Sequence, residues 1–456
     1  LQDNNILACA KHFPGHGDTD KDSHKTLPTI SHSKKRINEV ELVPFKNLIN
    51  NGLGSVMTAH LFIPSLDSID NTPISLSRKV VTDLLTQEMG FKGLKFTDGL
   101  NMKAVSDLYE PGDLDVKALI AGNDVLLCAE DVPKAIENIQ DAISAKELSQ
   151  IEIDSKCWKI LMAKKWMNLD QYKPIDIGII KDSVITSKTL DLNAKLIKSS
   201  ITLLQNYDSI IPLERLDTLK IASLVIGESG NSFQMMLNNY AAVDSFSISE
   251  NANIKQQAII LDKLSEYNLV IVSIHKSNAN AWKDYKILKN TDIFLQTIAL
   301  QSKVVLTIFA NPYSINSLLF TDNFDAMLLG YQNSKLAQEK VAQSVFGGLS
   351  INGAIPVSTK HFNIGSGIKT DSIRMSYSNL LNSEFNPILK YKIDSTISSA
   401  ILEKAIPGCQ ILIAKEGQVV FKESYGYHTY DNKIKVKDSD VYDLASITKI
   451  GATVPA

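Results

Sequence analysis

Residues Lys11–Pro28 read KHFPGHGDTDKDSHKTLP, and this segment decides the interpretation of the chain. It follows a short apolar run, Ile6–Ala10, which predicts a strand that leads into a polar loop. The chain of 456 residues holds 8 histidines, and three of them fall in this segment. Because loops after strands carry the chemistry of barrel and open-sheet enzymes, the segment predicts a functional site.

Two simpler interpretations of this loop are weaker. A solvated surface loop is disfavoured because Pro14, Gly15 and Gly17 give the segment a shaped turn. A calcium loop would need glycine and glutamate at positions where the sequence has serine and threonine. The residues compared with that calcium pattern are Asp18, Asp20, Asp22, Ser23 and Thr29.

The remaining alternatives are a zinc site and proton transfer. His12 and His16 could bind zinc, but no helical H-E-x-x-H frame surrounds them. Asp22 and His24 are two residues apart, so in an extended segment their side chains lie on the same side. A carboxylate beside an imidazole fixes its tautomer and suits a general acid/base working near neutral pH. Lys11 and His12 would then donate hydrogen bonds toward a substrate.

A partner for such an acid/base occurs in Gly93–Met102, which reads GLKFTDGLNM. Asp98 lies where the expected strand ends, and the glycine that follows would let a substrate approach. The alternative is that Asp98 caps a helix expected over Met102–Tyr109. The local sequence favours neither interpretation over the other.

Together, the long histidine motif and the strand-end F-T-D resemble the family 3 glycoside hydrolases, most closely their β-N-acetylglucosaminidase branch. The resemblance implies a retaining mechanism with Asp98 as the nucleophile, His24 as the acid/base and Asp22 as its dyad partner. An imidazole in this role departs from the usual pair of carboxylates. The residues that the resemblance implies for sugar binding are Lys11, His12 and His16.

The substrate implied is a carbohydrate that ends in β-linked N-acetylglucosamine, either an oligosaccharide or a muropeptide. A β-glucosidase of the same family is the first alternative, and the Asp–His dyad argues against it. A non-catalytic sugar-binding module is the second. Neither a metal nor a cofactor is expected. The family's substrates favour a bacterial periplasm or cell envelope.

Composition excludes several classes of function. At 44% hydrophobic, the chain is long enough for two or three cores. Its net charge of -3 gives no argument for binding nucleic acid, and no apolar run reaches membrane-spanning length. The 4 cysteines show no metal-ligand spacing and no disulfide framework, and Cys9 and Cys128 are expected to be core thiols.

Residues 1–170 alternate expected strands with helices, which predicts a parallel sheet covered by helices. The family implies a (β/α)8 TIM barrel, which needs eight strand–helix units. About four occur before residue 170, so we expect the C-terminal half of a barrel in a chain truncated at Leu1. The expected strands after Ile6–Ala10 are Gly54–His60, Leu94–Thr97 and Asp124–Cys128, and the expected helices include Ile37–Asn50, Ser77–Met89 and Trp158–Trp166.

Residues 171–362 contain continuous apolar runs, which predict a sheet buried on both faces. They resemble the family's C-terminal α/β sandwich domain, and no G-x-G-x-x-G or P-loop suggests a nucleotide. A linker is expected over 363–386. The expected strands are Ile221–Ile226, Leu269–Ile274, Val304–Phe309 and Ala326–Leu329, and the expected helices are Leu192–Gln205 and Leu336–Phe346.

Residues 387–456 begin with an expected helix, Ile393–Lys404, and a hairpin of strands Gln410–Ala414 and Val419–Ser424. Ser446 lies three residues before Lys449, so a helix would let the amine take the hydroxyl proton. With the strands before it, this S-x-x-K resembles the start of a serine β-lactamase-like α+β domain. The resemblance implies Ser446 as nucleophile and Lys449 as base of a second, incomplete site that we expect to be inactive.

Overall fold

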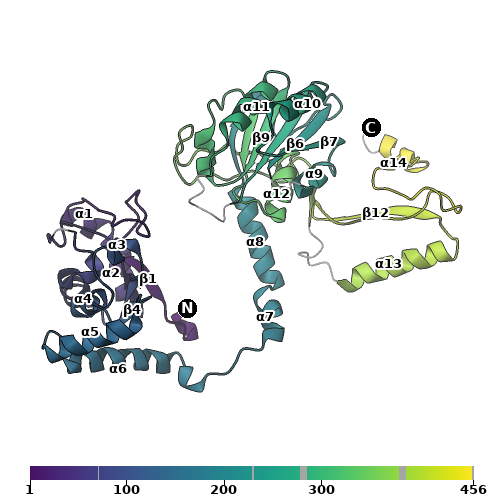
Figure 1. Ribbon diagram of the computed structural model, residues 1–456. Helices are drawn as coiled ribbons and strands as arrows, with labels where there is room; N and C mark the ends of the chain where they lie inside the picture. Colours follow the sequence, from purple (N-terminus) through teal and green to yellow (C-terminus); the bar gives the residue numbers. More distant parts are fainter. Residues whose placement is uncertain (70, 228–230, 278–284, 379–386, 454–456) are drawn as a thin grey trace. The chain divides into compact units, whose positions relative to one another are not determined.

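The computed structural model describes residues 1–69, 71–227, 231–277, 285–378 and 387–453 (Figure 1). They fall into two compact units, Leu1–Ile175 and Asp176–Ala456. The end of the expected linker, 379–386, and the last three residues of the chain lie outside the described residues. No helix in the described ranges is long and apolar enough to cross a membrane.

The first unit is built on a parallel sheet whose four strands follow one another in chain order. The strand expected at Ile6–Ala10 starts later, so Lys11 and His12 lie on the strand and not in the loop after it. Both expected neighbours, near Gly54–His60 and Leu94–Thr97, are confirmed with small shifts at their ends. The strands are β1 (Cys9–Phe13), β2 (Ser55–Thr58), β3 (Leu94–Gly99) and β4 (Val125–Leu127).

The single helix expected over Ile37–Asn50 is wrong. The chain forms α1 (Lys34–Glu39) and α2 (Leu42–Asn50), separated where the backbone of Val40 leaves the helical region. Three apolar side chains of this stretch, Val40, Val43 and Leu48, are exposed. The side chains that enter the core are Ile37, Leu42 and Phe45.

Two other helix predictions in the first unit are corrected. The helix expected over Ser77–Met89 begins after Arg78, its N-cap residue, and the Ser77 hydroxyl donates to Asp67 Oδ2 at 2.6 Å. This helix, η3 (Lys79–Glu88), is a π-helix. The helix expected over Met102–Tyr109 is reduced to α3 (Lys103–Ser106). The remaining α-helices of this unit are α4 (Asp113–Ala121), α5 (Val132–Ser144) and α6 (Gln150–Trp166).

The expectation that Cys9 and Cys128 are core thiols is wrong, since both side chains are exposed. Cys9 opens β1, which is one edge of the four-stranded sheet. Cys128 follows β4, the other edge, and has a left-handed backbone with φ 54°. Edge positions lack a neighbouring strand to cover them. The core of the unit packs instead around Phe13, Val56 and Leu61.

The second unit contains a six-stranded sheet in the order β5-β10-β9-β8-β6-β7, parallel except for β5. Alternate residues of its strands enter two separate cores, as Ile271 and Val272 do, which confirms a sheet buried on both faces. Helices α10 and α11 cover one face, and α9 and α12 cover the other (Figure 1). The strands are β5 (Thr202–Asn206), β6 (Ile221–Gly227), β7 (Val243–Ile248), β8 (Leu269–His275), β9 (Lys303–Phe309) and β10 (Ala326–Leu329), and the helices are α7 (Ile177–Val184), α8 (Ser187–Ser200), α9 (Asn231–Leu237), α10 (Ile254–Leu264), α11 (Lys289–Ala299) and α12 (Lys335–Val345).

The helix expected over Leu192–Gln205 is wrong in its last turn, because α8 ends at Ser200 and the chain continues as β5. Within the expected linker, Arg374 donates to the carbonyls of Leu213 and Phe346, which ties this stretch to the six-stranded unit. A smaller sheet follows, and its expected hairpin is confirmed as antiparallel. Its elements, with the helices beside it, are β11 (Ser376–Tyr377), β12 (Gly408–Lys415), β13 (Gln418–Gly426), α13 (Pro387–Leu402) and α14 (Ile447–Thr453).

Candidate active site at the strand ends of the first unit

Asp98 lies near the C-terminal end of β3, where only 14% of its side chain is exposed. Its Oδ1 accepts the backbone N–H of Gly99 at 2.9 Å. Its Oδ2 faces His12 Nε2 at 3.7 Å, which is too long for a hydrogen bond. The helix-cap alternative is wrong, because the residue that caps α3 is Met102, with no side-chain cap bond. Asp98 therefore presents one carboxylate oxygen toward His12 on β1.

His12 is the half-buried neighbour of this carboxylate on β1. Burial lowers the pKa of His12, and the Asp98 charge opposes the effect only partly. The imidazole is therefore neutral at pH 7, and it can offer a hydrogen bond without a charge. His16 lies edge-on to it, with the ring centroids 5.9 Å apart. Lys11, the preceding strand residue, is exposed, and its charge also lowers the pKa of His12.

Asp22 and His24 form the expected pair. His24 Nδ1 lies 2.8 Å from Asp22 Oδ1, and the same oxygen accepts the His24 backbone N–H at 2.9 Å. The backbone around this pair is not extended as expected, because the N–H groups of Lys25 and Thr26 both donate to the Asp22 carbonyl in a turn. The two bonds from His24 hold the pKa of Asp22 below its usual value. The carboxylate thus stays ionised through the pH range in which an imidazole titrates.

Ser23, the residue between Asp22 and His24, connects this pair to the residues at the strand ends. Ser23 is buried, and its hydroxyl lies 3.2 Å from His16 Nε2. His24 is also near enough for its charge to lower the pKa of His12. A continuous set of contacts therefore runs from Asp98 through His12 and His16 to the turn that carries the dyad. The imidazole of His24 itself is 74% exposed, so a substrate can reach it.

A second histidine at the strand ends escaped the sequence analysis. His60, just beyond β2, is fully buried and contacts Gly99 O and Ser75 Oγ. The available signal was its position at the end of an expected strand, where polar residues gather in parallel-sheet enzymes. His60 therefore lies beside the backbone of Gly99, the residue that follows Asp98.

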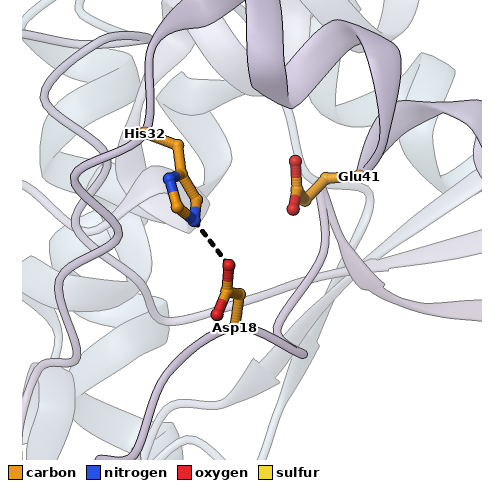
Figure 2. Close-up of side chains that lie close together, drawn as sticks. All are labelled: Asp18, His32 and Glu41. Atoms are coloured by element: carbon orange, nitrogen blue, oxygen red, sulfur yellow. Dashed lines mark hydrogen bonds and ion pairs between the residues drawn. The ribbon is translucent and has the colours of Figure 1, made fainter.

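A cluster of charged side chains, Asp18, His32, Arg36 and Glu41, connects the histidine loop to the residues that follow it. Asp18 Oδ2 lies 2.5 Å from His32 Nε2, and Figure 2 shows these side chains facing one another near Glu41. The three residues could offer oxygen and nitrogen ligands to a metal ion. However, Arg36 already donates to both Glu41 oxygens, at 2.5 and 2.6 Å, and approaches Asp18 at 3.7 Å. Gly15 packs on the same glutamate, where an added Cβ would lie 2.9 Å from Glu41 Cβ.

The second pair expected from the sequence lies in the other unit. Lys449 Nζ donates to Ser446 Oγ at 3.1 Å, at the start of α14. Both residues are exposed. The structure thus brings this pair together in a solvent-facing position.

Residues 1–163 match the glycosyl hydrolase family 3 N-terminal domain. Beta-hexosaminidase A of Pseudoalteromonas piscicida is 31% identical over 253 residues, which cover 50% of this chain and 41% of that protein. A beta-hexosaminidase of Chromobacterium violaceum is 35% identical over 130 residues, which cover 28% of this chain and 36% of that protein. The chain therefore spans about two fifths of the length of these relatives.

Two solved structures resemble the fold of this chain. A family 3 beta-N-acetylglucosaminidase from Paenibacillus sp. superposes with a TM-score of 0.62 at 25% identity, over 77% of this chain and 67% of that one. A beta-glucosidase from Listeria innocua gives a TM-score of 0.62 at 18% identity, over 76% and 50%. The second likeness concerns the fold alone. The comparisons confirm a mixed α/β fold with parallel sheets, and the first unit is similar to the glycosyl hydrolase family 3 N-terminal domain.

Proposed function

We propose that the first unit carries the reacting groups of a retaining exo-glycosidase, which releases terminal β-linked N-acetylglucosamine from the non-reducing end of its substrate. The observation that carries the proposal is the set of contacts that joins Asp98 to the Asp22–His24 dyad. The similarity to beta-hexosaminidases supports the choice of sugar. The substrates we propose are N-acetylglucosamine-containing oligosaccharides or muropeptides of the cell wall.

In the first step, Asp98 Oδ2 attacks the anomeric carbon as the bond to the leaving oxygen breaks. Protonated His24 gives its proton to that oxygen, so the aglycone leaves as a neutral alcohol. The product is a glycosyl ester of Asp98. Asp22 stabilises the imidazolium and holds the ring through Nδ1, which leaves Nε2 to transfer the proton.

In the second step, neutral His24 takes a proton from water as the water oxygen attacks the anomeric carbon. The ester bond breaks, and the Asp98 carboxylate is restored. Two inversions at the same carbon retain the configuration. Lys11, His12 and His16 would bind the sugar hydroxyls, and neutral His12 can donate to a hydroxyl beside the nucleophile without lowering its negative charge.

The test is hydrolysis of a chromogenic N-acetyl-β-glucosaminide beside the matching β-glucoside. The proposal predicts faster cleavage of the N-acetylglucosaminide and β-N-acetylglucosamine as the first product seen by NMR. Faster cleavage of the glucoside would favour the β-glucosidase alternative. Binding of N-acetylglucosamine with no turnover of either glycoside would favour a sugar-binding module.

The domain assignment is also a proposal. We take 1–170 as the C-terminal half of a (β/α)8 barrel, 171–362 as the family's α/β sandwich domain, and 387–456 as the first piece of a serine β-lactamase-like domain. The two open edges of the sheet at β1 and β4 support a barrel half, since a complete barrel has none. Limited proteolysis should release fragments that end within 363–386, and cleavage inside the six-stranded sheet would contradict the assignment.

The Ser446–Lys449 pair supports the assignment of the third piece, but we expect no acylation there. A general base works best in a desolvated pocket, whereas both side chains are exposed. Incubation with a fluorescent penicillin should therefore leave the chain unlabelled. Labelling that disappears in Ser446→Ala would contradict this expectation.

A further inference from the structure

His60 is buried against the backbone of Gly99, the residue that follows Asp98. None of its surface is exposed, so it cannot contact a substrate. Its Nε2 lies 3.0 Å from Gly99 O, and its Nδ1 lies 2.7 Å from Ser75 Oγ. A carbonyl oxygen only accepts, so Nε2 carries the proton and the Ser75 hydroxyl donates to Nδ1. The ring is thus a neutral donor with a fixed tautomer.

The backbone of Gly99 is held at both of its polar groups. Its N–H, in the peptide that joins it to Asp98, donates to Asp98 Oδ1 at 2.9 Å, while its carbonyl, in the following peptide, accepts from His60 and from the Met102 N–H at 3.0 Å. The position of the Asp98 carboxylate therefore depends on how the backbone of Gly99 is held. In this set of contacts, His60, which follows β2, is the side chain that holds Gly99 from a distant part of the sequence.

The support for His60 continues into the core as a buried polar network. Asn123 donates to the Ser75 carbonyl at 2.8 Å, and Thr58 donates to Asn123 Oδ1 at 3.0 Å. All of these side chains are fully buried. Such a network fixes one arrangement, because moving any member leaves a buried polar group without a partner. It connects β2, the turn before η3 and the start of β4.

We propose that His60 is a positioning residue for the nucleophile: it holds Gly99 through its carbonyl, so that the N–H of the same residue keeps the Asp98 carboxylate facing the substrate. This inference rests on the proposed function. Burial lowers the pKa of His60 against the opposing charge of Asp98, which agrees with a ring that stays neutral. A misplaced nucleophile slows bond formation more than it weakens sugar binding.

The test compares two substitutions on the chromogenic N-acetyl-β-glucosaminide. His60→Leu keeps the bulk and removes the donor, and we expect kcat to fall by about 10- to 100-fold with KM changed less than about twofold. His60→Gln restores a donor near the position of Nε2, and we expect it to recover most of kcat. If His60 had only a structural role, the loss of activity in each variant would match its loss of folded protein. His275→Leu removes a matched buried histidine from the second unit and should leave kcat per folded molecule unchanged.

A second readout does not depend on turnover. In the unsubstituted chain, the ring nitrogens of His60 should show by NMR a neutral imidazole protonated on Nε2, and Ser75→Ala should perturb Nδ1. A charged ring, or a proton on Nδ1, would overturn the inference even if His60→Leu fails to fold. Unchanged kcat in His60→Leu, or equal loss in His60→Gln, would overturn it while the proposed function stands. No turnover in the unsubstituted chain would contradict both.

Discussion

The Asp22 carboxylate and the His24 imidazole are joined twice, through the ring nitrogen at 2.8 Å and through the backbone N–H at 2.9 Å, by one carboxylate oxygen. The pairing is a local property of the Asp-x-His spacing, since an aspartate commonly bonds the backbone two residues on. The turn therefore presents the imidazole with its tautomer already set. Its distance from the nucleophile depends on the anchoring of the loop.

Replacing the nucleophile should abolish turnover and keep the fold. Asp98→Asn retains the size of the side chain and a carbonyl that can accept from Gly99, but it cannot form the ester. We expect kcat to fall by about a thousandfold or more, as for other lost nucleophiles. Initial rates with the chromogenic substrate and the circular dichroism spectrum measure the two effects. Asp107→Asn, an exposed site, is the control; equal loss there would show a general defect.

Replacing the acid/base should change the pH profile. His24→Ala should lower kcat/KM by about 100- to 10,000-fold for poor leaving groups and much less for activated ones, which need no proton. The acidic-to-neutral limb of the pH profile should disappear in the variant. Asp22→Asn should have a smaller effect in the same direction, and Asp20→Asn, exposed in the same loop, should have none. A limb that persists in His24→Ala would assign the proton to another group.

The stability of the cluster formed by Asp18, His32, Arg36 and Glu41 should depend on Arg36 and not on a metal ion. Arg36→Gln leaves Glu41, whose side chain is 8% exposed, without the guanidinium that donates to both of its oxygens. Because 37% of the Arg36 side chain is exposed, the pair is only partly desolvated, and we expect a destabilisation of about 1–2 kcal/mol in the first unit. Thermal unfolding with and without EDTA measures both effects. A large shift of the melting temperature with EDTA would show that the cluster of Asp18, His32 and Glu41 binds a metal.

The second unit should lose stability in mild acid. Burial lowers the pKa of His275 to about 4, whereas a histidine in an unfolded chain titrates near 6.5. Between these values the unfolded chain binds more protons, so stability rises with pH and is lost as the pH falls from about 6.5 toward 4. A tenfold change in proton affinity is worth about 1.4 kcal/mol, so the loss is roughly 3 kcal/mol. Denaturant unfolding at pH 7 and pH 4.5 measures it, and His275→Gln should flatten the difference.

The central strands of the six-stranded sheet were predictable because continuous apolar runs such as Leu269–Ile274 must be buried on both faces. The strands of this sheet that were missed, β5 and β7, are its two edges. In β7 only Val243 is buried, and one residue separates β5 from the end of α8, so neither was marked by the continuous apolar run of a central strand. Edge strands depend on a neighbour that the local sequence does not reveal.

The candidate site divides in a similar way. The Asp22–His24 pair follows from a spacing of two residues, and Asp98 follows from its place at a strand end. The role of His60 depends on contacts with Ser75 and Gly99, which are 15 and 39 residues away in sequence. The ion pair of Arg36 with Glu41 also depends on the break between α1 and α2, which the helical pattern of the sequence does not reveal. Long-range partners of this kind appear only once the fold is known.

The central claim, a covalent intermediate on Asp98, is tested most directly by trapping. The chain would be incubated with 5-fluoro-N-acetyl-β-glucosaminyl fluoride, digested and analysed by mass spectrometry. The account predicts one added fluorosugar on the peptide that contains Asp98, and none in Asp98→Asn. A sugar attached to another residue, or hydrolysis of the chromogenic substrate with inversion of configuration, would contradict it.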